Sequence, residues 1–241
     1  MRNHSSLLDV STVLVPKASD VLADRLRELI LDEGLPEGTP LPTERELVAQ
    51  SGLSRGSVRE ALRVLETEGL IVTKAGRNGG SAIRRPSRES ISRSFELFLR
   101  SHGVRFDAVI EARESVEPAA ARLAAQHRTD EDIAEITQIQ QEMESISDNT
   151  AKFAKANLKW HLAVVKASKN ELLIAFLDAI SRPIYAATEY PSLNTVELRR
   201  EVIRVHRRVL EAIVERDGDA AFRRMERHIN AYRQMANKVV K

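Results

Sequence analysis

Residues 41–72 read LPTERELVAQSGLSRGSVREALRVLETEGLIV, and this stretch decides the fold of the first part of the chain. Thr43 and Glu46 have the spacing of a capping box, so a helix is expected to begin there. Ser-Gly-Leu at 51–53 ends that helix, and Ser54 can cap a second one. The apolar residues of the second helix recur at helical spacing and predict a buried stripe of Val58, Ala61, Leu62 and Leu65. Two helices joined by a short turn that contains a glycine predict a helix-turn-helix.

The segments on either side complete this unit. From residue 20 to residue 30 the apolar side chains again follow helical spacing, which predicts a further helix. Residues 70–73 and 81–84 are apolar and β-branched, and the glycine-rich residues between them favour a turn, so a β-hairpin is expected. These elements predict a winged helix-turn-helix domain over residues 19–85, preceded by a flexible arm at 1–18.

The remainder of the chain is predicted to be helical. Residues 86–89 include a proline among polar residues and are expected to form a linker. Helical patterns then cover residues 89–101, 106–127, 130–147, 150–168, 171–188, 195–217 and 219–238. No fixed-period repeat is evident, so an antiparallel bundle of about seven helices over residues 90–241 is favoured over a solenoid. The fold class is therefore expected to be mainly α, a winged helix-turn-helix domain followed by an all-α helical bundle.

Composition excludes several classes of protein. Of the 241 residues, 42% are hydrophobic and 30% are charged, which is typical of a folded globular chain. The chain has no cysteine, which excludes disulfides and thiolate metal sites and is typical of a reducing compartment. No apolar run approaches the roughly 20 residues that a membrane helix needs. A cytoplasmic protein without a membrane partner is expected.

The distribution of charge points to nucleic acid more clearly than the total does. The formal net charge is only +2. Residues 17–44 carry three basic and seven acidic side chains, a net charge of −4, whereas residues 45–88 carry nine and four, a net charge of +5. Basic side chains neutralise phosphates, so the helix-turn-helix and the hairpin are expected to face double-stranded DNA.

The second helix of the helix-turn-helix offers the side chains that read bases. Arg55 and Arg59 lie four residues apart near its N-terminus, away from the buried stripe, where a recognition helix enters the major groove. Guanidinium groups fork onto guanine or phosphate, serine hydroxyls can donate to phosphate, and a glycine-arginine pair on the hairpin can reach the minor groove. The residues expected at DNA are Ser54, Arg55, Ser57, Arg59, Gly76 and Arg77. The alternative is an ordinary solvated basic face.

This part of the chain resembles a known family. The segments that carry the resemblance are LPTEREL at 41–47, LSR at 53–55, VREAL at 58–62 and GLI at 69–71. They closely resemble the N-terminal domain of GntR-superfamily transcription regulators over about residues 20–85. The resemblance implies that Arg45, Arg55 and Arg59 contact operator DNA and that Ser54 and Ser57 assist.

Histidines in the helical region raise the question of a metal site. Asn157 and His161 are four residues apart and share a helix face, while His206 and His228 lie on two later predicted helices. Three neutral imidazoles and an oxygen donor on facing helices can hold a divalent ion. Separated histidines that are solvated or satisfied in a core are the alternative.

A second resemblance bears on that question. EARESVE at 111–117, the Asn157 and Trp160-His161 segment, the His206 segment and MERH at 225–228 resemble the FCD effector domain of the FadR branch over about residues 90–235. The resemblance implies a divalent ion, zinc or nickel, held by an aspartate and three histidines at positions 157, 161, 206 and 228. In this chain Asn157 stands where the family has the aspartate. We therefore expect the site to retain metal more weakly and to be more positive, which favours an anion.

Arg113 stands where the family uses an arginine to grip an effector carboxylate, and a guanidinium fork matches two carboxylate oxygens. A salt bridge to Glu111, Glu114 or Glu117 is the alternative role. The combined expectation is a homodimeric regulator, a repressor and not an enzyme, whose operator binding responds to a small carboxylate or sugar acid. A constitutive DNA-binding protein with a purely dimerising bundle and a metal-dependent hydrolase are the alternatives. Two features speak against the hydrolase. The sequence contains no H-E-x-x-H motif, and Asn157 stands where the carboxylate that could activate water would be.

Overall fold

The computed structural model describes residues 15–74, 80–188 and 195–239, with the side chains of 182–188 and 237–239 left undescribed. The chain divides into two compact units, Met1–Ser87 and Arg88–Lys241. Most of the expected arm at 1–18 lies outside the described residues. Within the described residues, no helix is both long and apolar enough to cross a membrane.

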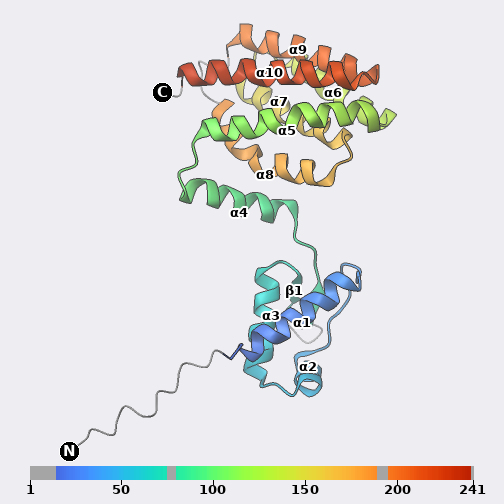
Figure 1. Cartoon of the computed structure of the whole chain (residues 1–241), viewed down its shortest axis with the longest axis vertical. Helices are drawn as coiled ribbons and strands as arrows, with labels where there is room; N and C mark the ends of the chain where they lie inside the picture. Colours follow the sequence, from blue (N-terminus) through green and yellow to red (C-terminus); the bar gives the residue numbers. More distant parts are fainter. Residues whose placement is uncertain (1–14, 75–79, 189–194, 240–241) are drawn as a thin grey trace, which may run out of the picture. The chain divides into compact units, whose positions relative to one another are not determined.

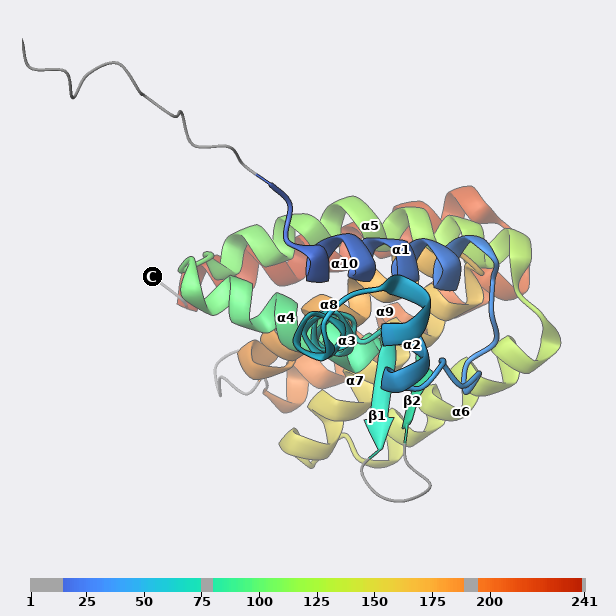
Figure 2. The ribbon, with the colours of Figure 1, turned by 90° about the horizontal axis from the view of Figure 1, so that it is seen from below.

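The first unit is a winged helix-turn-helix, as predicted. Its elements are α1 (Ala18–Asp32), α2 (Glu44–Ser51), α3 (Arg55–Thr67), β1 (Ile71–Lys74) and β2 (Gly80–Ile83). The two strands pair antiparallel, with Ile71 opposite Ile83, and Figure 2 shows them side by side. The predicted stripe of α3 is buried against Leu26 and Ile30 of α1 and Leu47 of α2. This apolar core fixes α3 on the three-helix scaffold and leaves its other face exposed.

Local hydrogen bonds explain where α2 and α3 begin. Thr43 Oγ1 accepts from the Glu46 amide at 3.3 Å, and the Thr43 amide donates to Glu46 Oε2 at 2.7 Å, which completes the predicted capping box. Between the helices, Gly52 has φ 69°, a left-handed conformation that glycine adopts without steric cost. The Ser54 hydroxyl then accepts from the Ser57 amide at 3.1 Å and caps α3.

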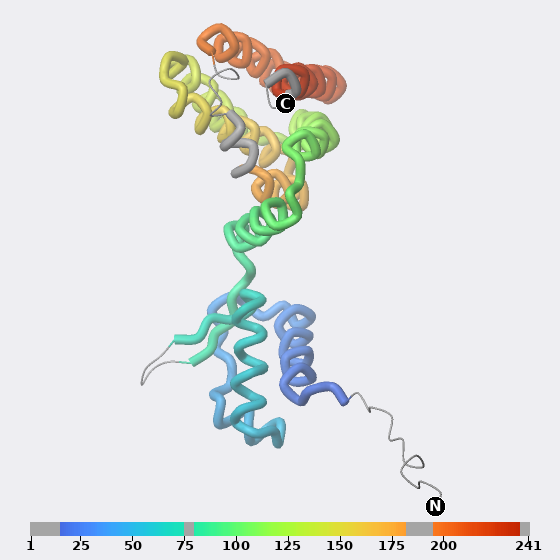
Figure 3. Tube along the Cα trace, turned by 90° about the vertical axis from the view of Figure 1, so that its left-hand side faces the viewer, coloured from blue at the N-terminus to red at the C-terminus, as the bar shows by residue number. Residues whose placement is uncertain are grey.

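The second unit is all-helical over its described residues. Its helices are α4 (Arg88–Ser101), α5 (Phe106–His127), α6 (Asp130–Ser145), α7 (Thr150–Ala167), α8 (Glu171–Thr188), α9 (Val196–Val214) and α10 (Gly218–Val239). The long helices α5 and α10 pack along each other (Figure 1), and α9 is a neighbour of α10 (Figure 3). Trp160 of α7 is fully buried at the centre of the main core.

Several helix limits differ by one to three residues from the sequence-based ranges, and two of the differences are informative. The first helix of this unit begins at Arg88, inside the predicted linker at 86–89. Helix α9 ends at Val214 rather than at residue 217, because Arg216 takes the left-handed conformation with φ 60°. The Asp217 amide then donates back to the Ala212 carbonyl at 2.9 Å, the hydrogen bond of a Schellman cap.

Candidate functional site

Three histidines from three helices meet inside the second unit. His161 lies on α7, His206 on α9 and His228 on α10. The Nε2 atom of His228 is 3.0 Å from Nε2 of His206 and 3.3 Å from Nε2 of His161. Nitrogens bound about 2.1 Å from one divalent ion at tetrahedral or octahedral angles are about 3.0 to 3.4 Å apart. Both separations fall in that range, and all three donor nitrogens lie within 4.8 Å of one another, so the donor set suits a divalent metal.

The imidazoles are held in the neutral form that binds metal. His161 and His206 are almost fully buried, and burial lowers the pKa of both rings because it disfavours the cation. Burial lowers the pKa of His228 well below its ordinary value as well, and the neighbouring His161 and Arg113 act in the same direction. A neutral imidazole keeps the lone pair that a metal ion needs.

Glu117 on α5 fixes the orientation of His161. Its Oε2 is 2.6 Å from Nδ1 of His161, and its Oε1 accepts from Nε of Arg113 at 2.5 Å. Burial alone would raise the pKa of this carboxyl, but Arg113 and His161 outweigh burial and hold the pKa well below its usual range. The ionised carboxylate therefore accepts a hydrogen bond from Nδ1–H of His161. This fixes the tautomer in which Nε2 carries the lone pair, and that lone pair points toward the other histidines. The sequence predicted Glu117 only as a possible salt-bridge partner of Arg113.

Arg113 forms the salt bridge that was the alternative to effector binding. Both its side chain and that of Glu117 are nearly inaccessible. Glu111 and Glu114, the other proposed partners, instead bind Arg233 of α10 at 2.7 and 2.8 Å. In the described part of the chain, the hydrogen bond from Arg113 uses only Nε. Arg113 also lines the small cavity beside the histidines. Its two terminal nitrogens can therefore still donate hydrogen bonds to a ligand.

Asn157 contributes an oxygen to the same cavity. Its Oδ1 atom is buried and has no hydrogen-bond partner among the described residues. Asn157, Arg113, His161 and His228 all line this cavity of about 40 Å³. A buried amide oxygen without a partner loses the free energy of a hydrogen bond, and a cation would restore an interaction. Asn157, His161, His228 and Arg113 thus share one cavity, and His206 meets His228 beside it.

His206 is further held by Trp160, whose ring stacks on the imidazole with centroids 3.7 Å apart and an interplanar angle of 12°. His161 and His228 are themselves nearly parallel, with centroids 5.2 Å apart, and His206 stands edge-on to both. These contacts restrict ring rotation, so the Nε2 atoms are preorganised rather than mobile.

Five of the seven predicted DNA-contact residues lie within the described part of the first unit. Arg45, Ser54, Arg55 and Arg59 are exposed, and Ser57 is half-buried. Arg59 is not free, because its Nε donates to Oε2 of Glu44 at 2.8 Å. Both side chains of that pair remain open to solvent, so phosphates or bases can compete for the guanidinium. Gly76 and Arg77 of the predicted wing tip lie outside the described residues.

Comparisons with known proteins agree with both units. The profile of the family described as bacterial regulatory proteins, gntR family, matches residues 18–79, and the FCD domain profile matches residues 108–231, about half of the chain. The chain belongs to the GntR family. It is therefore a GntR-family, DNA-binding transcription regulator that carries an FCD effector domain.

Individual relatives are similar along most of the chain. The Glc operon transcriptional activator of Escherichia coli (strain K12) is 29% identical over 225 residues, which are 89% of this chain and 87% of that protein. The HTH-type transcriptional repressor NanR of Salmonella arizonae is 30% identical over 227 residues, 89% of this chain and 82% of that protein. The solved structure titled Streptococcus agalactiae GntR has a TM-score of 0.67 at 25% identity and covers 90% of this chain and 99% of that one. These regulators make an enzyme the less favoured interpretation.

Proposed function

We propose that this GntR-family regulator changes its affinity for operator DNA when a small organic acid binds beside a divalent metal ion in its FCD domain. The observation that carries the proposal is the convergence of three neutral imidazole Nε2 atoms from α7, α9 and α10. Without an ion, this arrangement stabilises the imidazoles little, because each pair of nitrogens can share at most one hydrogen bond. A divalent ion satisfies all three lone pairs together.

His161, His206 and His228, with the Oδ1 atom of Asn157, would hold the ion. Zinc and nickel both suit imidazole donors. When bound, the ion supplies a Lewis-acidic cation with coordination positions left for ligand oxygens. Because Asn157 is neutral where an aspartate would carry a charge, the ion keeps more of its positive charge, and this favours an anionic ligand.

Arg113 would orient that anion. The Arg113 Nε bond to Glu117 fixes the guanidinium plane, and Arg113 lines the cavity that His161 and His228 also line, so its terminal nitrogens would meet the anion there. Two N–H groups in one plane match the two oxygens of a carboxylate. The salt bridge and the effector contact are therefore compatible roles of one side chain.

At DNA, two copies of the chain would place one α3 helix in the major groove at each half of a pseudo-palindromic operator. Arg45, Arg55 and Arg59 would contact bases and phosphates, with Ser54 and Ser57 on phosphate and Gly76 and Arg77 at the minor groove. We propose that the homodimer acts in the cytoplasm and represses transcription, as the similar NanR is named to do. The acid would favour a dimer arrangement that no longer fits both half-sites.

The test is fluorescence anisotropy of the full-length protein with a labelled duplex from the region upstream of its own operon. We expect binding that weakens when zinc or nickel and a carboxylate are added together. His161→Ala and His206→Ala should lose both metal and the response, whereas His127→Ala, at an exposed histidine of α5, should keep both. Stoichiometric metal retained in both site variants would refute the metal site. DNA binding that ignores every acid would instead favour the constitutive alternative.

A further inference from the structure

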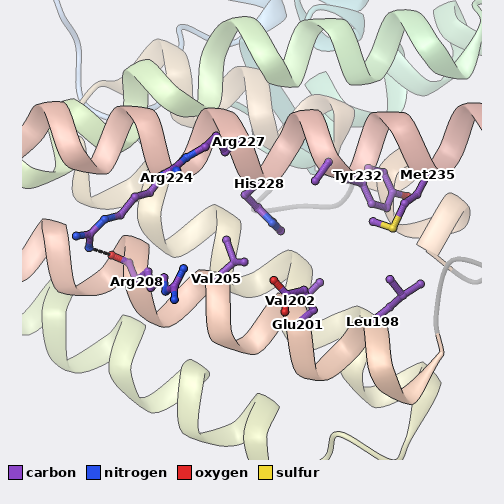
Figure 4. A pocket seen from close by; sticks show the side chains of 11 residues that line it. Leu198, Glu201, Val202, Val205, Arg208, Arg224, Arg227, His228, Tyr232 and Met235 are labelled. Atoms are coloured by element: carbon purple, nitrogen blue, oxygen red, sulfur yellow. Dashed lines mark hydrogen bonds between the residues drawn. The ribbon is translucent and has the colours of Figure 1, made fainter.

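A groove beside the metal site suggests what kind of acid binds. It has a volume of about 270 Å³ and runs between α9 and α10 (Figure 4). Its walls near the metal site are mostly apolar, with Val202 and Val205 from α9 and Met235 from α10. Two polar groups line the same stretch: Tyr232, whose buried hydroxyl has no hydrogen-bond partner among the described residues, and Glu201, which pairs with Arg204. His228 lies between these walls and points from α10 toward α9 in the figure. The groove is therefore a mostly apolar space in contact with a metal-binding side chain.

The groove and the small metal-site cavity share a wall. Val202, His228, Tyr232 and Met235 line both spaces. The cavity of about 40 Å³ has room for a carboxylate or a few water molecules, since one water needs about 10 to 15 Å³ by this measure. The body of any larger acid must therefore lie in the groove. Apart from Tyr232, Glu201 and His228 itself, the described residues of the walls near the metal site offer no hydrogen-bonding side chain to the hydroxyl groups of a sugar acid.

The far end of the groove is cationic. Arg208 of α9 and Arg227 of α10 line it and are exposed. Neither guanidinium has a carboxylate within salt-bridge distance among the residues that the structure describes, whereas the adjacent Arg224 lies 3.9 Å from Glu211 and donates to the Arg208 carbonyl. Two arginines without carboxylate partners at the end of an apolar groove match an anionic group.

We infer that the effector is a dicarboxylate with an apolar middle, an inference that depends on the proposed function. One carboxylate lies at the metal and Arg113, the chain follows the groove, and the second carboxylate binds Arg208 and Arg227. From Val202 to Arg208 the helix rises about 9 Å, six residues at about 1.5 Å each. An acid whose first carboxylate lies in the small cavity beside Val202 must extend along the groove to approach Arg208, and the long chain of suberate does this better than a short hydroxy acid.

The test is isothermal titration calorimetry on the full-length, zinc-loaded protein with acetate, malonate, octanoate and suberate. We expect the affinity for suberate to exceed the affinity for malonate by about tenfold or more. It should exceed the affinity for octanoate, the monocarboxylate of the same length, by a similar factor. The double variant Arg208→Ala, Arg227→Ala should bind suberate only as tightly as octanoate. The matched control Arg223→Ala removes an exposed arginine of α10 that does not line the groove, and it should leave both affinities unchanged.

A second variant tests the apolar walls. Val205→Trp fills the groove beyond the metal site, so it should weaken suberate and octanoate about tenfold or more and leave zinc content and acetate binding intact. If zinc and acetate bind but suberate gains nothing over malonate, or the double variant keeps the suberate preference, the dicarboxylate assignment is wrong and the proposed function stands. If neither zinc nor any acid binds, both are wrong.

Discussion

Replacing Glu117 with glutamine tests the proposed metal centre most directly, because this carboxylate accepts hydrogen bonds from two buried donors. One oxygen accepts from Nε of Arg113 and the other from Nδ1 of His161. Glutamine has almost the same shape but only one acceptor oxygen. If that oxygen accepts from His161, the amide NH₂ faces Arg113, donor against donor. If it accepts from Arg113, the NH₂ donates to Nδ1 and the His161 proton moves to Nε2, the atom that binds metal.

The magnitude follows from burial. The side chains of Arg113 and Glu117 are 4% and 0% exposed, so the variant leaves a guanidinium buried without an anion. Breaking a buried pair in this way costs about 3 to 5 kcal/mol of unfolding free energy. Removing the group that orients a metal-binding histidine weakens metal affinity by about 10- to 100-fold.

The assay is urea unfolding followed by circular dichroism in a chelator, together with competitive titration of zinc. Glu142→Gln is the matched control, because the side chain of Glu142 is 47% exposed and its Oε2 lies 3.9 Å from Nζ of Lys159. An exposed pair of this kind contributes about 0 to 1 kcal/mol. The reasoning is refuted if Glu117→Gln unfolds like the control and binds zinc as tightly as the wild-type protein.

Three further predictions address the ligand set, the operator and pH. Asn157→Asp should tighten zinc binding by roughly tenfold or more in a competitive titration, because it adds a negative charge beside the ion, and it should destabilise the metal-free protein. Arg59→Ala should weaken specific operator binding by roughly 1 to 3 kcal/mol in anisotropy titrations, whereas Arg63→Ala, further along α3 and 77% exposed, should cost less. The pKa values of His206 and His228 are lowered on folding, so the unfolded chain binds more protons than the folded one below pH 6.5. The unfolding free energy of the metal-free protein should therefore fall as pH decreases below 6.5, by roughly 1.4 kcal/mol per pH unit for each histidine, and zinc should reduce that slope.

The elements that sequence patterns predicted well are those that local interactions determine. The capping box of Thr43 and Glu46 spans three residues, and the α3 stripe repeats every three or four, so both are visible in the printed chain. The family of both units was likewise predicted correctly from short motifs. The end of α9 was misplaced because a left-handed Arg216 carries no residue-type signal of the kind that glycine provides.

The site depends on contacts that are distant in sequence. His228 meets His206 and His161 across 22 and 67 residues, and only the family resemblance connected these three positions. The choice of Glu117 as the partner of Arg113 was open for a similar reason. Arg233 of α10 binds Asp107, Glu111 and Glu114 of α5, which leaves Glu117 to Arg113, and no spacing within α5 could show that competition. The pair of Glu44 and Arg59 joins two helices and was missed on the same ground.

The stacking of Trp160 on His206 gives the chain an optical label of its own. Trp160 is the only tryptophan among the 241 residues, so the intrinsic indole emission of the whole protein comes from one ring that stacks on His206 of the proposed metal site. A metal ion bound to His206 would place a positive charge beside the ring that the indole faces, so the emission is expected to change when the site is filled. Occupancy of the site can thus be followed in unmodified protein, without a dye or an engineered residue.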